Sequence, residues 1–93
     1  MKKRAVGIIP ARYKSSRYPG KPLVKLLGKP MIIWVAELTA KALGKENVYV
    51  ATEDIRIFNV VEDYGFNCKM TPDHLLTGTD RVAYAAKSIN ADI

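Results

Sequence analysis

The sequence predicts an α/β fold in which a parallel β-sheet carries helices on both faces. Three segments with the apolar, β-branched composition of buried strands alternate with three segments of helical periodicity. Because each strand is followed by a helix, right-handed βαβ crossovers are the most economical topology. The chain has 93 residues, of which 48% are hydrophobic, so it can bury one modest core and is expected to form a single domain over residues 1–93.

The first predicted strand, Ala5–Ile9, is ended by Pro10, which lacks a backbone donor. The loop over residues 10–23 therefore starts at the carboxyl end of a strand, where open α/β sheets bind their ligands. Arginine can take two phosphate oxygens at once, and lysine supplies a compact charge. The candidates for binding phosphate in this loop are Arg12, Arg17 and Lys21.

Other residues of the same loop fit an anion site. Ser15 and Ser16 offer hydroxyl donors, and Gly20 allows the backbone to approach a ligand closely. The loop is not a Walker A motif, because Pro22 follows Gly20-Lys21 where Ser or Thr is required, and no GxGxxG follows the first strand. A solvated basic loop without a ligand is the alternative interpretation of this stretch taken alone.

A short extended stretch, Leu23–Leu27, and a helix over residues 31–43 are predicted next. Gly28 turns the chain between them, Pro30 suits the first turn of the helix, and Gly44 caps its end. The first half of this helix is apolar on most sides, so we expect it to pack on the sheet.

The second strand is predicted at Asn47–Ala51 and the second helix at Glu53–Tyr64. Thr52 is expected to cap this helix, while Glu53 and Asp54 lie where the helix dipole favours negative charge. A metal site or an acid/base pair at these two carboxylates is the less favoured alternative. The apolar positions of this helix are Ile55, Phe58 and Val61, and Gly65 is expected at its C-cap.

The third strand is predicted at Phe66–Met70 and the last helix at about Thr79–Ile89, with Thr79 as a plausible cap. The carboxyl ends of parallel strands meet at one edge of a sheet. The loop over residues 71–78 is therefore expected to open beside the basic loop, so that both can face one ligand.

The single cysteine and the single histidine are not expected to form a reactive site. Cys68 alternates with polar residues on the third strand, so it is predicted to be a small buried hydrophobe rather than a nucleophile. Asp73 and His74 are adjacent, and neighbouring residues rarely converge on one metal ion, so we expect no transition metal. Without a second cysteine no internal disulfide can form, which favours a cytoplasmic location.

The positive charge is concentrated in the first third of the chain. The net charge is +6, nine of the fifteen Lys and Arg residues lie at or before Lys29, and the first acidic residue is Glu37. Charge alone fits nucleotide phosphates, nucleic acid or an anionic membrane surface. We predict no nucleic-acid partner, because no helix-turn-helix, RRM or zinc-finger pattern occurs. We predict no membrane partner, because the longest apolar run, Met31–Ala36, is too short to cross a bilayer.

Both loops resemble those of a known family. Ile8-Ile9-Pro10-Ala11-Arg12, followed by Ser15, Arg17 and Pro19-Gly20-Lys21-Pro22-Leu23, is similar to the opening signature of the 3-deoxy-manno-octulosonate cytidylyltransferases, also called CMP-Kdo synthetases. Asp73-His74 and Thr77–Arg81 are similar to the stretch with which that family closes over cytosine and ribose, with Thr77 in place of its serine. The resemblance implies a Rossmann-like sheet of the nucleotide-diphospho-sugar transferase type. Cytidylyltransferases for sialic-acid-like or spore-coat sugars, another nucleotide or sugar-phosphate binding module, and a basic nucleic-acid-binding domain are the alternatives.

The resemblance implies transfer of CMP from CTP to a 3-deoxy-2-ulosonic acid sugar, Kdo, with release of pyrophosphate for lipopolysaccharide biosynthesis. Its catalytic residues would be Arg12 and Lys21. Arg81 is expected in the first helical turn, where a cation opposes the helix dipole, and this unfavourable position suggests a functional role. An exposed arginine whose stem lies on the surface is the alternative. The nucleotide-binding residues implied by the resemblance are Pro10, Ala11, Arg12, Ser15, Arg17, Lys21, Thr77, Gly78, Thr79 and Arg81.

The resemblance also implies that these 93 residues are the N-terminal nucleotide-binding portion of a larger cytidylyltransferase domain. Mg²⁺ would bind with CTP, and its protein ligands are expected beyond residue 93, so no metal ligand is assigned within the chain. The larger enzyme would be a homodimer, and the portion in hand is expected to turn over little or not at all. An exposed sheet edge and an exposed apolar face predict self-association or marginal stability.

Overall fold

A three-stranded parallel sheet organises the computed structural model, which describes residues 5–14, 19–72 and 78–90. Its strands are β1 (Gly7–Pro10), β4 (Val48–Thr52) and β5 (Asn67–Met70), in the order β1-β4-β5. Both pairings are parallel, so the three predicted strands and their direction are confirmed, with bounds that differ by one or two residues. The prediction that the first strand stops before Pro10 was wrong, because Pro10 is the last residue of β1 and pairs with Ala51.

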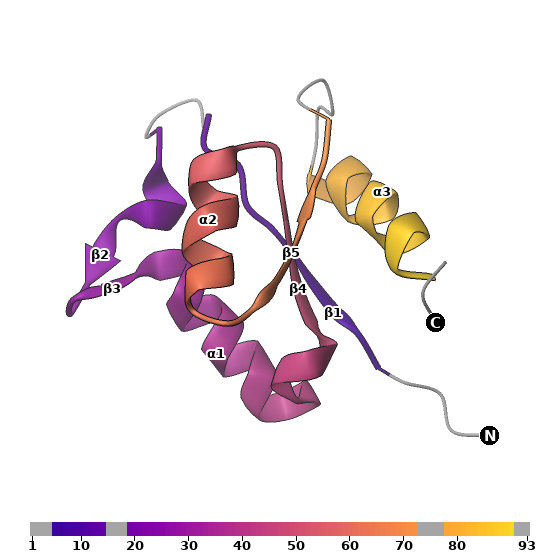
Figure 1. Ribbon diagram of the computed structural model, residues 1–93, viewed down its shortest axis with the longest axis horizontal. Coiled ribbons are helices and arrows are strands. Elements are labelled where there is room, and N and C mark those ends of the chain that lie inside the picture. Colours follow the sequence, from indigo (N-terminus) through magenta and orange to yellow (C-terminus); the bar gives the residue numbers. More distant parts are fainter. Residues whose placement is uncertain (1–4, 15–18, 73–77, 91–93) are drawn as a thin grey trace.

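Helices cover both faces of this sheet, as predicted. Figure 1 shows α1 (Met31–Leu43) and α2 (Ile55–Asp63) on one side and α3 (Gly78–Asn90) on the other. Residues from α1, α2 and the sheet form the main core, which includes Ile33, Val50 and Ile57. On the opposite face, α3 packs on β1 and β4. No helix among the described residues is long and apolar enough to cross a membrane.

The bounds of α1 agree with the sequence prediction. The helix starts directly after Pro30 and ends directly before its C-cap Gly44, whose N–H donates to the carbonyl of Ala40 over 2.8 Å. Pro30 is the N-cap residue rather than part of the first turn, a shift of one position. Gly7 of β1 lies against this helix, because a Cβ there would come within 2.9 Å of the side chains of Thr39 and Leu43.

A short hairpin between β1 and α1 was not predicted as such. A one-turn 3-10 helix, Lys21–Leu23, precedes the expected extended stretch and shares Leu23 with it. The stretch itself contains β2 (Lys25–Leu26), which pairs antiparallel with β3 (Lys29–Pro30). The hairpin is fixed to α1 because the indole N–H of Trp34 donates to the carbonyl of Leu26 over 2.8 Å. A second 3-10 turn, Lys45–Asn47, joins α1 to β4.

The start of α2 differs from the prediction. Thr52 belongs to β4, and the cap is Asp54, whose carboxylate accepts the N–H of Arg56 over 2.8 Å. The helix begins at Ile55, which is 55% exposed, while Ile57 is fully buried. The prediction that Thr52 caps the helix was therefore wrong, and so was the inclusion of Glu53 in it.

The start of α3 is one residue earlier than predicted, whereas α2 starts two residues later than predicted. Because the helix already begins at Gly78, Thr79 lies in its first turn and is not its cap. The end of the helix at Asn90 is within one residue of the prediction, and Ala85 and Ile89 are buried against the sheet as its apolar face.

Candidate functional site

The carboxyl ends of β1 and β5 lie at one edge of the sheet. In the register of the strands Pro10 pairs with Ala51, and Thr52 pairs with Met70. Backbone hydrogen bonds extend both pairings by one residue. The N–H of Ala11, after β1, donates to the carbonyl of Ala51 over 2.9 Å, and the N–H of Thr71, after β5, donates to the carbonyl of Thr52 over 2.8 Å. The two loops therefore leave the same sheet edge, as predicted.

Arg12 and Lys21 meet at one cavity of about 440 Å³ at this edge. Its apolar walls come from the end of β1, from Pro22 and from the start of α1, while both cations are exposed to solvent. The N-terminal end of a helix favours anions, so α1 adds positive potential to that of the two side chains. The lining residues are Ile9, Pro10, Ala11, Arg12, Lys21, Pro22, Met31, Ile32 and Val35.

Glu53 anchors the basic loop, a role that was not predicted. Its carboxylate accepts the N–H of Tyr13 at 3.2 and 3.3 Å and the N–H of Lys14 at 3.4 Å. The hydroxyl of Thr52 lies 3.4 Å from the same carboxylate. Of the two acidic residues expected to serve α2, only Asp54 caps it.

Arg56 also reaches the basic loop from α2. Its guanidinium lies 3.4 Å from the centre of the Tyr13 ring, a cation–π contact. Asp54 holds it there through two hydrogen bonds, 2.9 Å from Nε to Oδ1 and 2.7 Å from Nη2 to Oδ2. The hydrogen bond from the Arg56 side chain is the main reason why the pKa of the Asp54 carboxyl is lowered.

Arg81 does not lie at the surface. The side chain is fully buried, and its Nη1 donates to the hydroxyl of Thr71 and, over 3.4 Å, to the carbonyl of Pro72. The alternative of an exposed arginine is therefore wrong. Arg81 holds the segment that follows β5, and it is not among the residues that line the cavity of Arg12 and Lys21.

The remaining predicted residues divide into three groups. Pro10 and Ala11 line the cavity, whereas Gly78 and the exposed Thr79 form the first turn of α3 and do not line it. The others lie outside the described residues: Ser15, Ser16, Arg17, Asp73, His74 and Thr77.

Cys68 is the buried strand residue that was predicted. Burial raises the pKa of its thiol to about 12, so it carries almost no thiolate at neutral pH. Its backbone N–H donates to the carboxylate of Glu62 over 3.0 Å. Within residues 5–14, 19–72 and 78–90, no three His, Cys, Asp or Glu side chains come close enough together to hold a metal ion.

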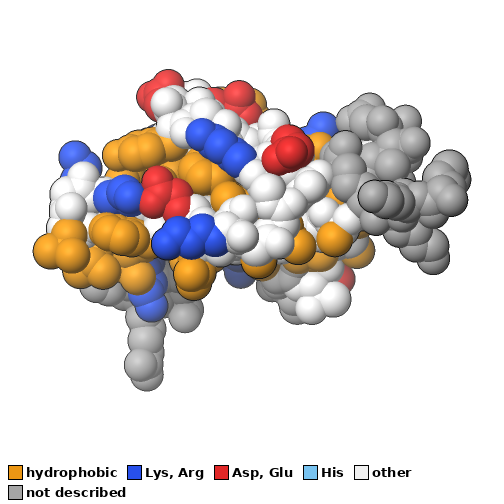
Figure 2. Space-filling view, turned by 90° about the horizontal axis from the view of Figure 1, so that it is seen from below, with side chains coloured by type: hydrophobic (Ala, Val, Ile, Leu, Met, Phe, Trp, Pro, Cys, Tyr) orange, Lys and Arg blue, Asp and Glu red, His pale blue; other side chains and the backbone are white. Residues whose placement is uncertain are grey.

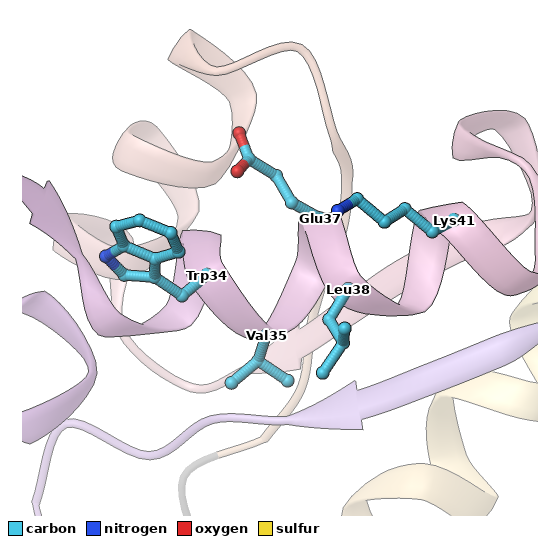
Figure 3. Close-up of a pocket in the computed structure, with 5 residues that line it drawn as sticks. All are labelled: Trp34, Val35, Glu37, Leu38 and Lys41. Carbon is cyan, nitrogen blue, oxygen red and sulfur yellow. The ribbon is translucent and has the colours of Figure 1, made fainter.

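Two further cavities contain none of the predicted site residues. One of about 350 Å³ lies on an exposed part of α1, where Val35 and Leu38 point the same way (Figure 3). Its lining residues are Trp34, Val35, Glu37, Leu38 and Lys41. The other, of about 540 Å³, is lined by Lys45, Glu46, Tyr49, Gly65 and Asn67.

The family model of the cytidylyltransferases matches residues 6–93. This chain belongs to the cytidylyltransferase family. As a member of it, the chain is 57% identical over 82 residues to a 3-deoxy-manno-octulosonate cytidylyltransferase 2 from Hydrogenovibrio crunogenus, a match that covers 88% of this chain and 33% of the relative. It is 52% identical over 75 residues to an 8-amino-3,8-dideoxy-manno-octulosonate cytidylyltransferase from Shewanella pealeana, which covers 81% of this chain and 31% of the relative.

A solved structure supports the same assignment for this cytidylyltransferase chain. The structure of CMP:2-keto-3-deoxy-manno-octonic acid synthetase complexed with CTP superposes with a TM-score of 0.87 at 43% identity, and the match covers 92% of this chain and 36% of that one. The Rossmann-like nucleotidyltransferase fold expected from the resemblance is thereby confirmed. The chain spans about a third of the length of the curated relatives that it matches.

Proposed function

We propose that this chain forms the CTP-binding part of an enzyme that transfers CMP from CTP to a 3-deoxy-2-ulosonic acid sugar and releases pyrophosphate. The observation that carries the proposal is the convergence of Arg12 and Lys21 on one cavity at the carboxyl edge of a parallel sheet. The names of the relatives and the CTP complex of the structural neighbour support the choice of nucleotide and of sugar class.

The chemistry asked of these residues is alignment and charge stabilisation. The anomeric hydroxyl of the sugar attacks the α-phosphorus of CTP and releases its proton. The bond between the α-phosphorus and the oxygen that bridges it to the β-phosphorus breaks, and pyrophosphate leaves with that oxygen. Arg12 and Lys21 would hold the triphosphate and take up the negative charge that develops on the leaving group. Ser15 and Arg17 are proposed to contact the phosphates or to support the loop.

The base and the ribose are proposed to lie between the two loops. Pro10 and Ala11 would form one wall, and Thr77, Gly78 and Thr79 the other. We propose a positioning role for Arg81, since its buried guanidinium holds Thr71 and Pro72 at the start of the second loop.

Magnesium belongs to the proposal as the partner of CTP, because triphosphate oxygens supply most of its ligands in such sites. Its protein ligands are proposed to lie beyond residue 93, so no residue of this chain is assigned as a ligand. We further propose that the longer protein is a cytoplasmic homodimer and that this chain alone turns over little. The relatives include enzymes named for Kdo and for its 8-amino analogue, and a comparison of both sugars as acceptors for the longer protein would choose between them.

The proposal is tested by calorimetric titration of the chain with CTP, UTP and ATP in the presence of magnesium. We expect preferential binding of CTP, and Arg12→Ala or Lys21→Ala should weaken it about tenfold or more, as the loss of a charged hydrogen bond does. Lys87→Ala on α3 is the matched control, because it removes an exposed cation far along the chain from the cavity. Equal binding of all three nucleotides, or binding of any duplex with steep salt dependence, would contradict the proposal.

A further inference from the structure

Tyr13 links the backbone positions of the two cations at the cavity. Arg12 directly precedes Tyr13, and the carbonyl of Tyr13 accepts the N–H of Gly20 over 2.7 Å. Gly20 in turn precedes Lys21 and is the N-cap residue of the 3-10 helix Lys21–Leu23. The hydrogen bond between Tyr13 and Gly20 therefore fixes the distance between the backbone positions of Arg12 and Lys21.

The contact between Tyr13 and Gly20 is close and depends on the absence of a side chain. Gly20 is buried, its φ is +77°, and a Cβ at that position would lie 3.1 Å from Cε2 of the Tyr13 ring. Any other residue would be strained there and would push the ring away. The ring of Tyr13 is held from another direction by the guanidinium of Arg56 at 3.4 Å.

Glu53 fixes Tyr13 to the sheet edge. Its carboxylate follows β4 directly and accepts the N–H groups of Tyr13 and Lys14, across 40 and 39 positions of sequence. A carboxylate near an anion site would normally repel phosphate, but here it is engaged by two backbone donors. The loop is thereby attached to the most buried strand of the sheet through residues that do not line the cavity themselves.

We propose that Tyr13, Gly20, Glu53 and Arg56 form a loop clamp that positions Arg12 and Lys21 for the phosphates of the nucleotide. This inference rests on the function proposed above. Long cationic side chains lose conformational entropy when they bind an anion. If the backbone that carries them is already fixed, binding does not also have to order the backbone. The members of the loop clamp are positioning residues, because they act through Arg12 and Lys21 and need no contact with the ligand.

The decisive variant is Glu53→Ala, tested on the 93-residue chain with two probes, CTP and inorganic pyrophosphate, each with magnesium. We expect both to bind about tenfold more weakly, the change that a charged hydrogen bond commonly contributes. Glu53→Gln should recover part of the affinity, because its amide oxygen still accepts a backbone N–H. Amide hydrogen exchange of Tyr13 and Lys14 should speed up in Glu53→Ala, while the amides of β4 stay protected.

Glu62→Ala is the matched control. Glu62 also accepts a backbone N–H, that of Cys68, over 3.0 Å, but it lies at the end of α2 away from the basic loop. Glu62→Ala should lower the free energy of unfolding about as much as Glu53→Ala does and leave the affinity for both probes unchanged. If Glu53→Ala fails to fold, Gly20→Ala provides the same test, because its Cβ would displace the Tyr13 ring. This variant should also bind both probes more weakly.

The outcomes separate this inference from the proposed function. If the unaltered chain binds pyrophosphate but shows no preference for CTP, the proposed function fails, and the pyrophosphate affinities still test the loop clamp. If the unaltered chain prefers CTP and Glu53→Ala binds CTP and pyrophosphate as tightly as the unaltered chain does, the loop clamp is refuted and the proposed function stands. Equal losses in Glu53→Ala and Glu62→Ala would also refute it, because they would reflect stability alone.

Discussion

Leu27 carries backbone strain at the tip of the β2–β3 hairpin. Its φ is +53°, it precedes Gly28 at +79°, and it is the sole residue other than glycine with a positive φ in the described part of the chain. Two successive positive φ values between paired strands are typical of a type I′ turn, which favours Asn-Gly. The side chain of Leu27 is 87% exposed, so it gains little from packing in return.

We therefore expect Leu27→Asn to stabilise the chain. Asparagine tolerates the left-handed region better than leucine, and the gain should be about 0.5–1 kcal/mol in the free energy of unfolding. Urea denaturation would show it as a higher midpoint with an unchanged m-value. Leu26→Asn is the control, since Leu26 lies in β2 outside the turn and should gain nothing. A destabilised Leu27→Asn variant would contradict the assigned turn.

At the level of elements, the N-terminus of α2 depends on Asp54. Its carboxylate accepts the N–H of Arg56, so Asp54→Ala should cost about 1 kcal/mol of unfolding free energy at neutral pH. Because the folded state lowers the pKa of this carboxyl, its contribution is present above the unfolded pKa and is lost as the pH falls through the folded pKa. The difference between the two proteins should therefore shrink below about pH 4.

Chemical denaturation at neutral and acidic pH would measure this difference. Asp54→Asn is the control, because asparagine keeps the cap and loses the ion pair with Arg56, so it should cost less than alanine at neutral pH. A cost of Asp54→Ala that stays the same at both pH values would show that the charge of the carboxylate contributes nothing.

The sequence predicted α1 well because Pro30 and Gly44 mark its limits, and both act locally. It failed at α2, because Thr52, Glu53 and Asp54 are each acceptable near a helix start, and local preferences do not choose among them. The choice is made by pairing and by distant contacts. Thr52 continues the register of β4 with β5, and Glu53 is engaged by the basic loop.

For the whole molecule, the parallel direction of the strands made the place of the candidate site predictable. It collects both loops at one edge, so charge and strand order indicated Arg12 and Lys21, together with Arg17, as candidates for binding phosphate. The contact between Tyr13 and Glu53 spans 40 positions and leaves no periodic or compositional signal. The burial of Arg81 was equally hidden, because it depends on how α3 packs against the segment after β5.

Exposed apolar side chains gather over α1 and the hairpin. Figure 2 shows apolar groups interspersed with Lys, Arg, Asp and Glu on the face that it presents. Leu38 on α1 is 70% exposed, and Trp34, Val35 and Leu26 are also exposed large hydrophobic residues. Val35 lines both the α1 cavity and the candidate site, so this apolar face adjoins the site. Such a face favours association with a second copy of the chain.

We expect the chain to self-associate with rising concentration and Leu38→Gln to shift it toward the monomer. Glutamine keeps helix propensity and replaces the most exposed apolar side chain of α1 by a polar one, so stability should change little. Sedimentation velocity over a concentration series measures the effect. Tyr84→Gln, an exposed position of α3 on the other side of the sheet, is the control and should associate like the unaltered chain. A chain that stays monomeric at every concentration, or equal effects of both variants, would show that the face of α1 does not drive association.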